Sequence, residues 1–306
     1  MAQTNPVSST ALPARREGSS SRFRLQLPDF MSSILRNRKA TVGLTILLIF
    51  SFMAIFANQL APTRPDRMVG RPHEAPSADY IFGTTRQGQD MFSQIVHGAR
   101  TTMVIGFVTG TVITLIGVVV GLSAGFLGGW VDEVLSLLMN VFLILPGLPL
   151  IIVVAGWLDR PGPLTIVLVL SVTSWAYGAR VLRSQALALR NSEFVAAARV
   201  SGESTPRIIL QEILPNMVSL VVSGWIGAVL YAILAEAGLE FIGLGDPNAI
   251  TWGTTLYWAQ NNQALLTGAW WTFVPPGLCI ALVGLSLTML NYGIDEITNP
   301  RLQDNS

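Results

Sequence analysis

Two acidic residues in an otherwise apolar segment are the first candidates for chemistry in this sequence. Glu236 and Glu240 are four positions apart, so an α-helix places both on one face. An acid at the centre of a bilayer costs about 2.5–3.5 kcal/mol on insertion scales, so acids at that depth are functional candidates by default. Two interpretations stay open. The pair lines the path of a polar solute, or it forms a structural ion pair with Arg86 or Arg100.

Other reactive side chains are too sparse for a catalytic or metal centre. His73 and His97 are too few and too far apart for a histidine metal site, and Cys279 alone excludes a disulfide framework or a cysteine cluster. Asp132 and Glu133 are better explained by the start of a helix than by contact with a solute. The sequence lacks the phosphate-binding pattern G-x-x-x-x-G-K-[ST], so we expect no ATP hydrolysis, no catalytic residue and no cofactor in this chain.

Composition indicates the class of protein. Hydrophobic residues make up 51% of the 306 positions and charged residues only 12%, against about a quarter in soluble domains. The net charge of +1 does not suggest a nucleic-acid partner. We therefore predict an all-α integral membrane protein. Six segments without charged residues predict six transmembrane helices, since a crossing needs roughly 20 apolar residues; they are 40–63, 101–131, 134–158, 161–179, 213–235 and 247–294, the last crossing only at Trp270–Leu290.

The distribution of basic residues predicts the orientation. With six crossings, 13 Lys and Arg residues fall on the side of the two termini and six on the other side, so both termini should be cytoplasmic. The predicted organisation has four parts. They are a disordered cytoplasmic tail (1–35), the first transmembrane helix with an extracytoplasmic loop (36–100), a five-helix core (101–292) that includes a cytoplasmic loop at 185–215, and a cytoplasmic tail (293–306).

The longest polar interruption of the apolar core reads "EFVAAARVSGESTPRIILQEILPN" at 193–216. Asn191 or Ser192 can cap a helix that starts at Glu193, and Gly202 should end or bend it. Thr205 followed by Pro206 predicts the start of a second helix. The pattern predicts a short, stiff helix–break–helix whose alanines allow close approach of a partner. An amphipathic elbow lying on the bilayer is the alternative.

The order of residues in this segment resembles the cytoplasmic coupling loop of binding-protein-dependent ABC importers. In that signature an Ala-Ala pair precedes a Gly and a Leu-Pro follows at a fixed distance. The matching positions here are Ala197, Ala198, Gly202, Leu214 and Pro215, and the sequence departs from the signature at Ala196 and Glu212.

Three further segments resemble the dipeptide/oligopeptide/nickel permease family within that class. They are "FGTTRQGQDMFSQIVHGART" at 82–101, "AEAGLEFIGLGDPNAITWGTTL" at 235–256 and "PPGLCIALVGLSLTMLNYGIDEITNPRL" at 275–302. The family usually has Asp in place of Thr85 and Arg in place of Gln89. The similarity covers roughly 35–302, and it is closest to the subunit whose partner is a second, related permease.

The resemblance implies a type I ABC importer permease fold with a cytoplasmic coupling helix, in a bacterial inner membrane. It implies three kinds of protein partner: a second permease, one or two cytoplasmic ATPase subunits that bind ATP and Mg²⁺, and an extracytoplasmic solute-binding protein. The residues that would contact the ATPase are Glu193, Phe194, Ala197, Ala198, Gly202, Glu203, Leu214 and Pro215. Glu236 and Glu240 would be possible residues of the translocation path.

The solute and some alternatives stay open at this stage. Oligopeptides are the first expectation and oligosaccharides the second, because members of the same family resemble sugar importers. Five aromatic residues suit an interfacial belt, although they could also stack on sugar rings or dock the binding protein. They are Trp252, Tyr257, Trp258, Trp270 and Trp271. A membrane enzyme would need an acid or histidine dyad at matching depth on two helices, and the sequence offers none beyond Glu236 and Glu240. A non-transporting scaffold that binds an ATPase is the remote alternative.

Overall fold

The structure, a computed structural model, describes residues 37–145, 147–157 and 162–298, and the regular elements in these ranges are helices joined by loops. The four longest helices are α2 (Arg38–Ile55), α4 (Met91–Leu127), α11 (Val218–Phe241) and α13 (Val274–Thr298). Within the described ranges, β pairing is limited to isolated bridges such as Met68–Gln89, without a named strand. The all-α prediction is confirmed, whereas the predicted disordered tail (1–35) and the last residues of the C-terminal tail lie outside the described residues.

Shorter helices connect these four. They are α3 (Ala57–Leu60), α5 (Gly129–Ile144), α6 (Gly147–Gly156), α7 (Pro163–Ser174), α8 (Ala176–Arg190), α9 (Glu193–Val200), α10 (Thr205–Ile208) and α12 (Trp252–Asn261). Single turns of other geometry complete the chain: the π turn η1 (Ile209–Ile213) and the 3₁₀ turns η2 (Leu214–Met217) and η3 (Trp270–Thr272).

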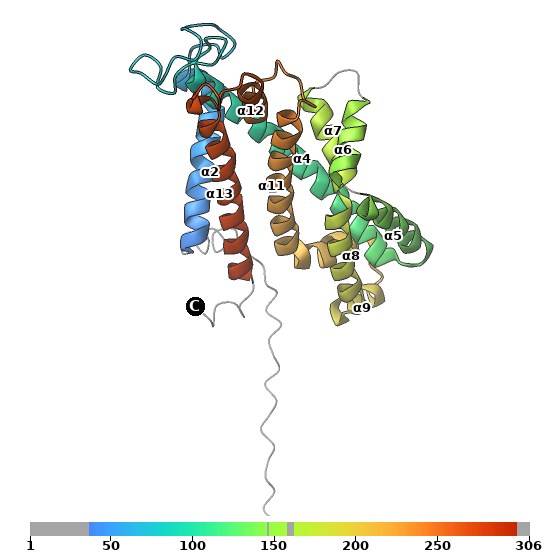
Figure 1. Ribbon diagram of the computed structural model, residues 1–306. Helices are drawn as coiled ribbons and strands as arrows, with labels where there is room; N and C mark the ends of the chain where they lie inside the picture. The colour runs from blue at the N-terminus through green and yellow to red at the C-terminus, as the bar shows by residue number, and fades with distance from the viewer. Residues whose placement is uncertain (1–36, 146, 158–161, 299–306) are drawn as a thin grey trace, which may run out of the picture.

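Helix α4 is the element around which the others are arranged. Its 37 residues give a length of about 55 Å at 1.5 Å per residue, well above a hydrocarbon core of about 30 Å. It therefore runs obliquely behind the other helices (Figure 1) and contacts α2, α5, α7, α8, α11 and α12. The helix begins ten residues before the predicted segment because the carboxylate of Asp90 accepts hydrogen bonds from the amides of Phe92 and Ser93.

Glycines let the neighbours of α4 approach its backbone. A Cβ atom added to Gly110 would lie 2.7 Å from the amide nitrogen of Val229 in α11. One added to Gly121 would lie 2.6 Å from the carbonyl oxygen of Ala179 in α8. Both distances are below any real contact of a Cβ atom, so side chains at these positions would separate the helices. Small residues at such contacts are typical of helix packing in membranes.

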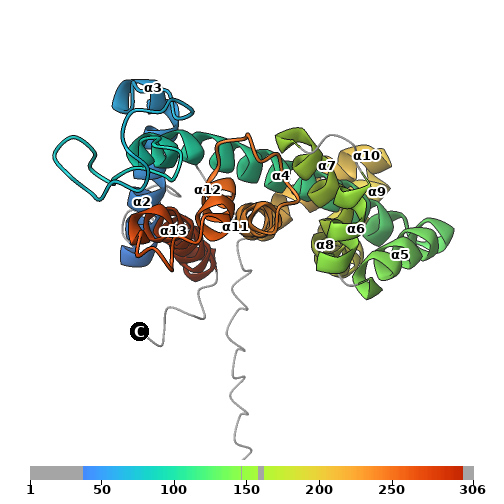
Figure 2. The ribbon, with the colours of Figure 1, turned by 45° about the horizontal axis from the view of Figure 1, so that its top comes forward.

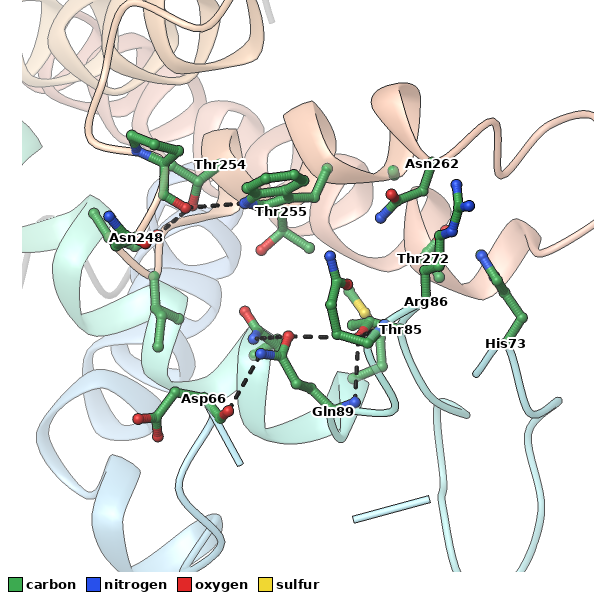
Figure 3. Close-up of a pocket in the computed structure, with 18 residues that line it drawn as sticks. Asp66, His73, Thr85, Arg86, Gln89, Asn248, Thr254, Thr255, Asn262 and Thr272 are labelled. Carbon is green, nitrogen blue, oxygen red and sulfur yellow. Dashed lines mark hydrogen bonds between the residues drawn. The ribbon is translucent and has the colours of Figure 1, made fainter. Parts of the chain in front are cut away.

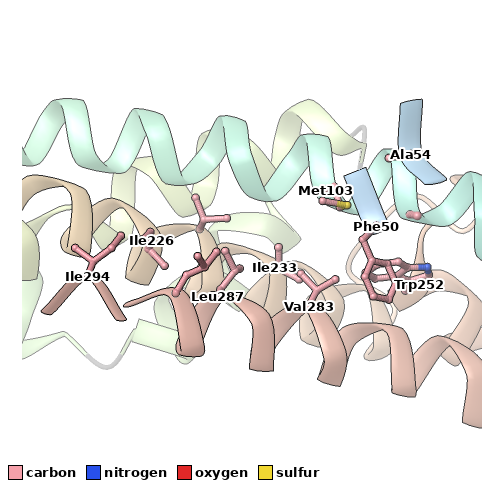
Figure 4. Packing of buried hydrophobic residues seen from close by; sticks show 12 residues of the cluster. Phe50, Ala54, Met103, Ile226, Ile233, Trp252, Val283, Leu287 and Ile294 are labelled. Carbon is pink, nitrogen blue, oxygen red and sulfur yellow. The ribbon is translucent and has the colours of Figure 1, made fainter. Parts of the chain in front are cut away.

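The largest hydrophobic cluster lies where α2, α4, α11 and α13 meet (Figure 4). Phe50 of α2 packs edge-on against Trp252 of α12, with 5.6 Å between the ring centroids. Val229 and Ile233 of α11 and Val283 of α13 are buried completely in the same cluster. This cluster joins the first and the last long helix, which are 219 residues apart at their nearest ends, into one bundle.

Among the residues that the structure describes, four helical segments are long and apolar enough to cross a membrane: Arg38–Ile55, Met91–Leu127, Thr205–Phe241 and Trp270–Glu296. Helices α7 and α8 form a pair bent by 41° and give a fifth crossing if they count as one. The third predicted crossing, 134–158, falls on α5 and α6, which have 16 and 10 residues. The predicted number of six crossings therefore stays a prediction.

The bundle has two different ends, which we call the α12 end and the α9 end. The α12 end carries α3, α12 and the loop at 61–90, while the α9 end carries α9, the start of α2 and the end of α13 (Figures 1 and 2). The loop at 61–90 is ordered by buried hydrogen bonds. The hydroxyl of Thr84 donates to the carbonyl of Arg71 (2.5 Å), and the indole of Trp271 donates to the carbonyl of Thr84 (3.1 Å).

Gly121→Ala should destabilise the protein although alanine favours helices. The added Cβ has no space against Ala179, and overpacking costs about 1–3 kcal/mol. The matched control is Gly224→Ala in α11, where a Cβ meets no atom within 4 Å and the change should be favourable by up to about 1 kcal/mol. The melting temperature of the purified protein in lipid measures both. Equal melting temperatures for the two variants would contradict the close contact of α4 with α8.

Candidate functional site

Residues 191–217, which we call the α9 segment, form a helix with a defined end. After Val200 the amide of Gly202 donates to the carbonyl of Arg199 (3.0 Å), and the amide of Glu203 donates to that of Ala198 (3.1 Å). Gly202 has φ +78°, the left-handed conformation that this type of helix end requires. The prediction that Gly202 ends the first helix is confirmed.

The two starts predicted in this segment differ in detail from the structure. Ser192 occupies the cap position of α9, but its hydroxyl donates to the carbonyl of Leu189 (2.6 Å) instead of accepting from the helix. The second helix begins at Thr205 as expected, with Ser204 and not Thr205 at the cap. It continues through η1 and η2 directly into α11, with a local departure from helical dihedral angles at Met217 (φ −113°, ψ 3°).

One side of the α9 segment is anchored to the bundle. Val195 is completely buried in a cluster formed with residues of α4, α8 and the turns before α11: Leu122, Phe126, Leu182, Ala186, Ile208, Ile213 and Met217. The guanidinium of Arg199 lies 5.3 Å from the ring centroid of Phe126. Helix α9 is therefore held to α4 by a buried contact and a cation–π contact.

The other side of the α9 segment is open. The exposed residues include most of those that the resemblance assigns to an ATPase contact, namely Glu193, Phe194, Ala197, Gly202 and Pro215, whereas Ala198, Glu203 and Leu214 are half-buried. Val200 is 90% exposed. Glu203 pairs with Arg207 at 3.8 Å across one turn. The chain thus presents a short helix with small and apolar side chains at the end of the bundle.

Helices α5 and α8 are joined by an ion pair beside this segment. The guanidinium of Arg183 donates to both carboxylate oxygens of Asp132, at 2.5 Å and 2.7 Å. The hydroxyl of Ser136 donates to Asp132 as well (3.0 Å). Asp132 therefore has a structural partner in α8. From the sequence, this acid was explained only by the start of a helix, and the ion pair was not predicted.

Glu236 and Glu240 lie at the α12 end and are buried, with 0% and 1% exposure. The hydroxyl of Thr102 in α4 donates to Glu236 (3.3 Å), and that of Thr251 before α12 donates to Glu240. Neither carboxylate has an arginine within 4 Å, so the ion pair with Arg86 or Arg100 is absent from the described residues.

A polar cavity of about 430 Å³ lies at the α12 end between the loop at 61–90 and α12 (Figure 3). We call it the α12-end cavity. Its walls carry mainly neutral groups, among them Thr85, Gln87, Gln89, Gln94, Asn248, Thr254, Thr255 and Asn262. Arg86 supplies a positive charge there, and partial burial together with Arg86 lowers the pKa of His73.

Two aromatic residues that suited an interfacial belt are instead buried hydrogen-bond donors. Trp252 is fully buried and its indole donates to the carbonyl of Ile95 (3.0 Å), and Trp271 fixes the loop at 61–90. Trp258 and Trp270 are 39% and 50% exposed. The belt prediction is thus wrong for Trp252 and Trp271, because hydropathy does not reveal which tryptophans have a partner inside the fold.

A second cavity of about 670 Å³, the central cavity, lies between α4, α5, α7, α8 and α11. Its lining is apolar with single polar side chains, which are Thr114, Thr173, Ser174, Tyr177, Ser223, Tyr231 and Asn291. Ser174 and Tyr231 are joined by a hydrogen bond of 3.4 Å. Glu236 and Glu240 line neither cavity. Sequence reasoning missed these hydroxyls because isolated Ser, Thr and Tyr residues are common in transmembrane helices.

Family models of known proteins match two parts of the chain. A model of the binding-protein-dependent transport system inner membrane component matches residues 117–304. A model of the N-terminal transmembrane domain of oligopeptide transport permease C matches residues 26–79. The chain belongs to the family of binding-protein-dependent transport inner membrane components. The predicted resemblance to the dipeptide/oligopeptide permease branch is confirmed.

Curated relatives of this permease family align over nearly the whole chain. The dipeptide transport system permease protein DppC of Bacillus subtilis (strain 168) is 33% identical, covering 90% of this chain and 86% of its own length. The oligopeptide transport system permease protein OppC of the same organism is 32% identical, with 90% of each chain covered. The di/tripeptide transport system permease protein DppC of Pseudomonas aeruginosa (strain UCBPP-PA14) is 33% identical over 91% and 93%.

Proposed function

We propose that this permease forms half of the translocation path of a peptide importer and that its α9 segment couples ATP hydrolysis in partner subunits to uptake. The observation that carries the coupling role is the α9 segment itself, a short helix exposed at one end of the bundle and closed at Gly202. ATP and Mg²⁺ would bind to one or two cytoplasmic ATPase subunits. The chain itself would contribute no cofactor site and no catalytic residue.

The contacts of the α9 segment suit the transmission of a force. Val195 ties α9 to α4 and α8, and the helical turns from Thr205 to Met217 lead directly into α11. A push on the exposed residues would therefore reach α4, α8 and α11 through buried contacts. The residues that would meet the ATPase are Glu193, Phe194, Ala197, Ala198, Gly202, Glu203, Leu214 and Pro215.

A second, related permease would complete the path. We propose that the central cavity is this chain's half of the wall, with Ser174 and Tyr231 facing the solute. Uncharged hydroxyls separated by apolar side chains provide weak binding, which suits passage. Glu236 and Glu240 could serve the path only if movement of the subunits exposed them, since both are buried in this conformation.

Peptides are the proposed solute, delivered by an extracytoplasmic binding protein. The support is that curated relatives aligned over about nine-tenths of the chain carry the names of dipeptide, di/tripeptide and oligopeptide transport permeases. Thr85 and Gln89, which replace the family's usual Asp and Arg, form a neutral pair here. The backbone amide of Gln89 donates to the Thr85 hydroxyl (3.2 Å), and the Thr85 hydroxyl lies 3.4 Å from the side-chain oxygen of Gln89. A neutral pair at this turn does not by itself favour sugars over peptides.

The proposed topology has six crossings in a bacterial inner membrane, with α5 and α6 forming one broken crossing and both termini inside. The support is the concentration of basic residues on the side of the termini and the position of α9 at the same end as the start of α2.

Cysteine labelling tests this orientation. In a Cys279→Ser background, Val200→Cys at the α9 end should react with a membrane-impermeant maleimide only after the inner face becomes accessible. Leu266→Cys at the α12 end should react from outside. The two positions are 90% and 83% exposed, so both are matched in accessibility. Labelling of Val200→Cys in intact cells would contradict the orientation.

Gly202→Val should weaken coupling without preventing insertion. A left-handed conformation costs a β-branched residue about 1–2 kcal/mol, whereas no neighbouring atom lies within 4 Å to oppose the side chain. The end of α9 should therefore be misplaced in most molecules, and binding-protein-stimulated ATP hydrolysis in lipid should fall about tenfold. Gly202→Asn is the matched control, because Asn tolerates this conformation. Normal stimulation in Gly202→Val would contradict the coupling role.

The solute is tested on the assembled transporter. Peptides of two to five residues, added with the cognate binding protein, should bind to that protein by calorimetry and stimulate ATP hydrolysis by the complex. Oligosaccharides of similar size should do neither. Stimulation by oligosaccharides alone would show that the importer carries sugars.

A further inference from the structure

All three arginines of α8 lie against α5 or against the turn that leads into it. The guanidinium of Arg183 donates to both carboxylate oxygens of Asp132, at 2.5 Å and 2.7 Å. The guanidinium of Arg180 donates to the side-chain oxygen of Asn140 (2.6 Å), which lies about two turns further along α5. The arginines of this set are Arg180, Arg183 and Arg190, and we call them the arginine ladder.

Arg190 covers the turn between α4 and α5. A Cβ atom added to Gly128 in this turn would lie 3.2 Å from Cζ of Arg190, so the guanidinium group rests on the backbone of the turn. Gly128 has φ +69°, a left-handed conformation that favours glycine. The arginine ladder therefore follows α5 from the turn before its start as far as Asn140.

The residues of α5 that receive these contacts belong to a polar stripe. Asp132, Ser136 and Asn140 are four positions apart, which places them on one face of the helix. The hydroxyl of Ser136 also donates to Asp132 (3.0 Å). Other faces of α5 carry exposed apolar side chains such as Leu137 and Ile144. Charged groups in transmembrane segments face the bundle and pair there, so the arginine ladder determines which face of α5 turns toward α8.

Helix α8 is firmly joined to the α9 segment. Two residues separate α8 from α9, and both the amide and the hydroxyl of Ser192 donate to the carbonyl of Leu189, at 3.0 Å and 2.6 Å. Val195 of α9 is buried in one cluster with Leu182 and Ala186 of α8. Because the arginine ladder lies on this same helix, it attaches α5 to the α9 segment.

The arginine ladder ends where the central cavity begins. Phe142 of α5 follows two residues after Asn140, and Tyr177 of α8 precedes Arg180 by three residues; both Phe142 and Tyr177 line the central cavity. The ring of Phe142 also packs edge-on against Trp175, with 5.4 Å between the ring centroids. The place of α5 on α8 therefore sets how two walls of the central cavity face each other.

We propose that the arginine ladder makes α5 part of one unit with α8 and the α9 segment, so that the α9 segment positions the α5 wall of the central cavity. This inference rests on the proposed coupling role of the α9 segment and adds α5 to the helices that the coupling reaches. The ladder and its partners Asp132 and Asn140 are positioning residues, and none of them lines the central cavity.

The geometry of the ion pair suits this role better than a simple attraction of charges would. The side chains of Arg183 and Asp132 are only 28% and 19% exposed, so solvent screens them less than an ion pair on the surface. A guanidinium that donates to both oxygens of one carboxylate fixes the orientation of the two groups as well as their distance. A displacement of α8 in any direction would therefore be passed to α5.

The first test measures coupling in the assembled transporter in lipid. Asp132→Asn should lower the stimulation of ATP hydrolysis by peptide-loaded binding protein by about fivefold, the lower end of typical coupling between two sites. Arg183→Gln should cause a similar loss. The double variant should lose no more than either single variant, because all three remove the same contact. Arg183→Lys keeps the charge but loses the two parallel hydrogen bonds, so it should recover only part of the stimulation.

Lys39→Gln is the matched control. It breaks the ion pair of Lys39 with Glu296 (3.7 Å), which joins α2 to α13 at the same end of the bundle but lies outside the arginine ladder. The control should keep normal stimulation at a temperature below the melting temperatures of all the variants, which are measured in parallel. An equal loss in Lys39→Gln would show that any broken ion pair at this end disturbs the complex, and it would overturn the proposal.

The second test measures whether α5 keeps its place relative to α9. In a Cys279→Ser background, spin labels at Leu137→Cys in α5 and Val200→Cys in α9 occupy exposed positions. With the arginine ladder intact, the distances between the labels should be the same with and without ATP and Mg²⁺. In Arg183→Gln they should shift or spread. A nucleotide-dependent distance in the protein with an intact ladder, or unchanged distances in Arg183→Gln, would overturn the proposal.

The outcomes separate this proposal from the function on which it rests. Normal stimulation in Asp132→Asn and Arg183→Gln, together with a loss in Gly202→Val, would overturn the role of the arginine ladder alone. Normal stimulation in all three variants would overturn the coupling role of the α9 segment as well.

Discussion

Close contact between α4 and its two neighbours α8 and α11 is the interaction on which the rest of this structure depends. Lipid provides little hydrophobic driving force between helices, so association depends on van der Waals contact and on hydrogen bonds inside the bundle. Gly110 and Gly121 supply that contact by letting the backbones of α11 and α8 approach α4. Because α4 is 37 residues long, it carries elements of both ends of the bundle on one rigid axis.

The two ends use this axis in different ways. At the α9 end, Val195 and Arg199 attach a short exposed helix to Leu122 and Phe126 of α4, and the free side stays open to a partner. At the α12 end, Thr102 of α4 is linked to both Glu236 and Trp252, and no polar side chain of that group faces solvent. One end therefore presents an exposed short helix, and the other end is held by internal hydrogen bonds.

Glu236 and Glu240 are buried and line neither of the two cavities, so their position does not support the role in a solute path that their depth in the membrane suggests. An acid at membrane depth is usually assigned to a solute or ion path. Here neither Glu236 nor Glu240 lines the α12-end cavity or the central cavity, and both acids are buried where α11 meets α4 and the residues before α12. The energetic cost of a buried acid is offset by local partners, so depth in the membrane alone does not identify a path residue.

The sequence by itself determined the class of protein, most of the helical segments and the end of α9 at Gly202. These features depend on hydropathy and on turn residues, which act over a few neighbours in the chain. The tertiary structure decided which groups meet: Arg183 with Asp132, Thr102 with Glu236, and Trp252 with Ile95. It also revealed that α4 starts at Met91 and that α5 and α6 are separate helices. Such pairings depend on contacts between residues 51 to 157 positions apart, and no local pattern encodes which distant residue fills a given space.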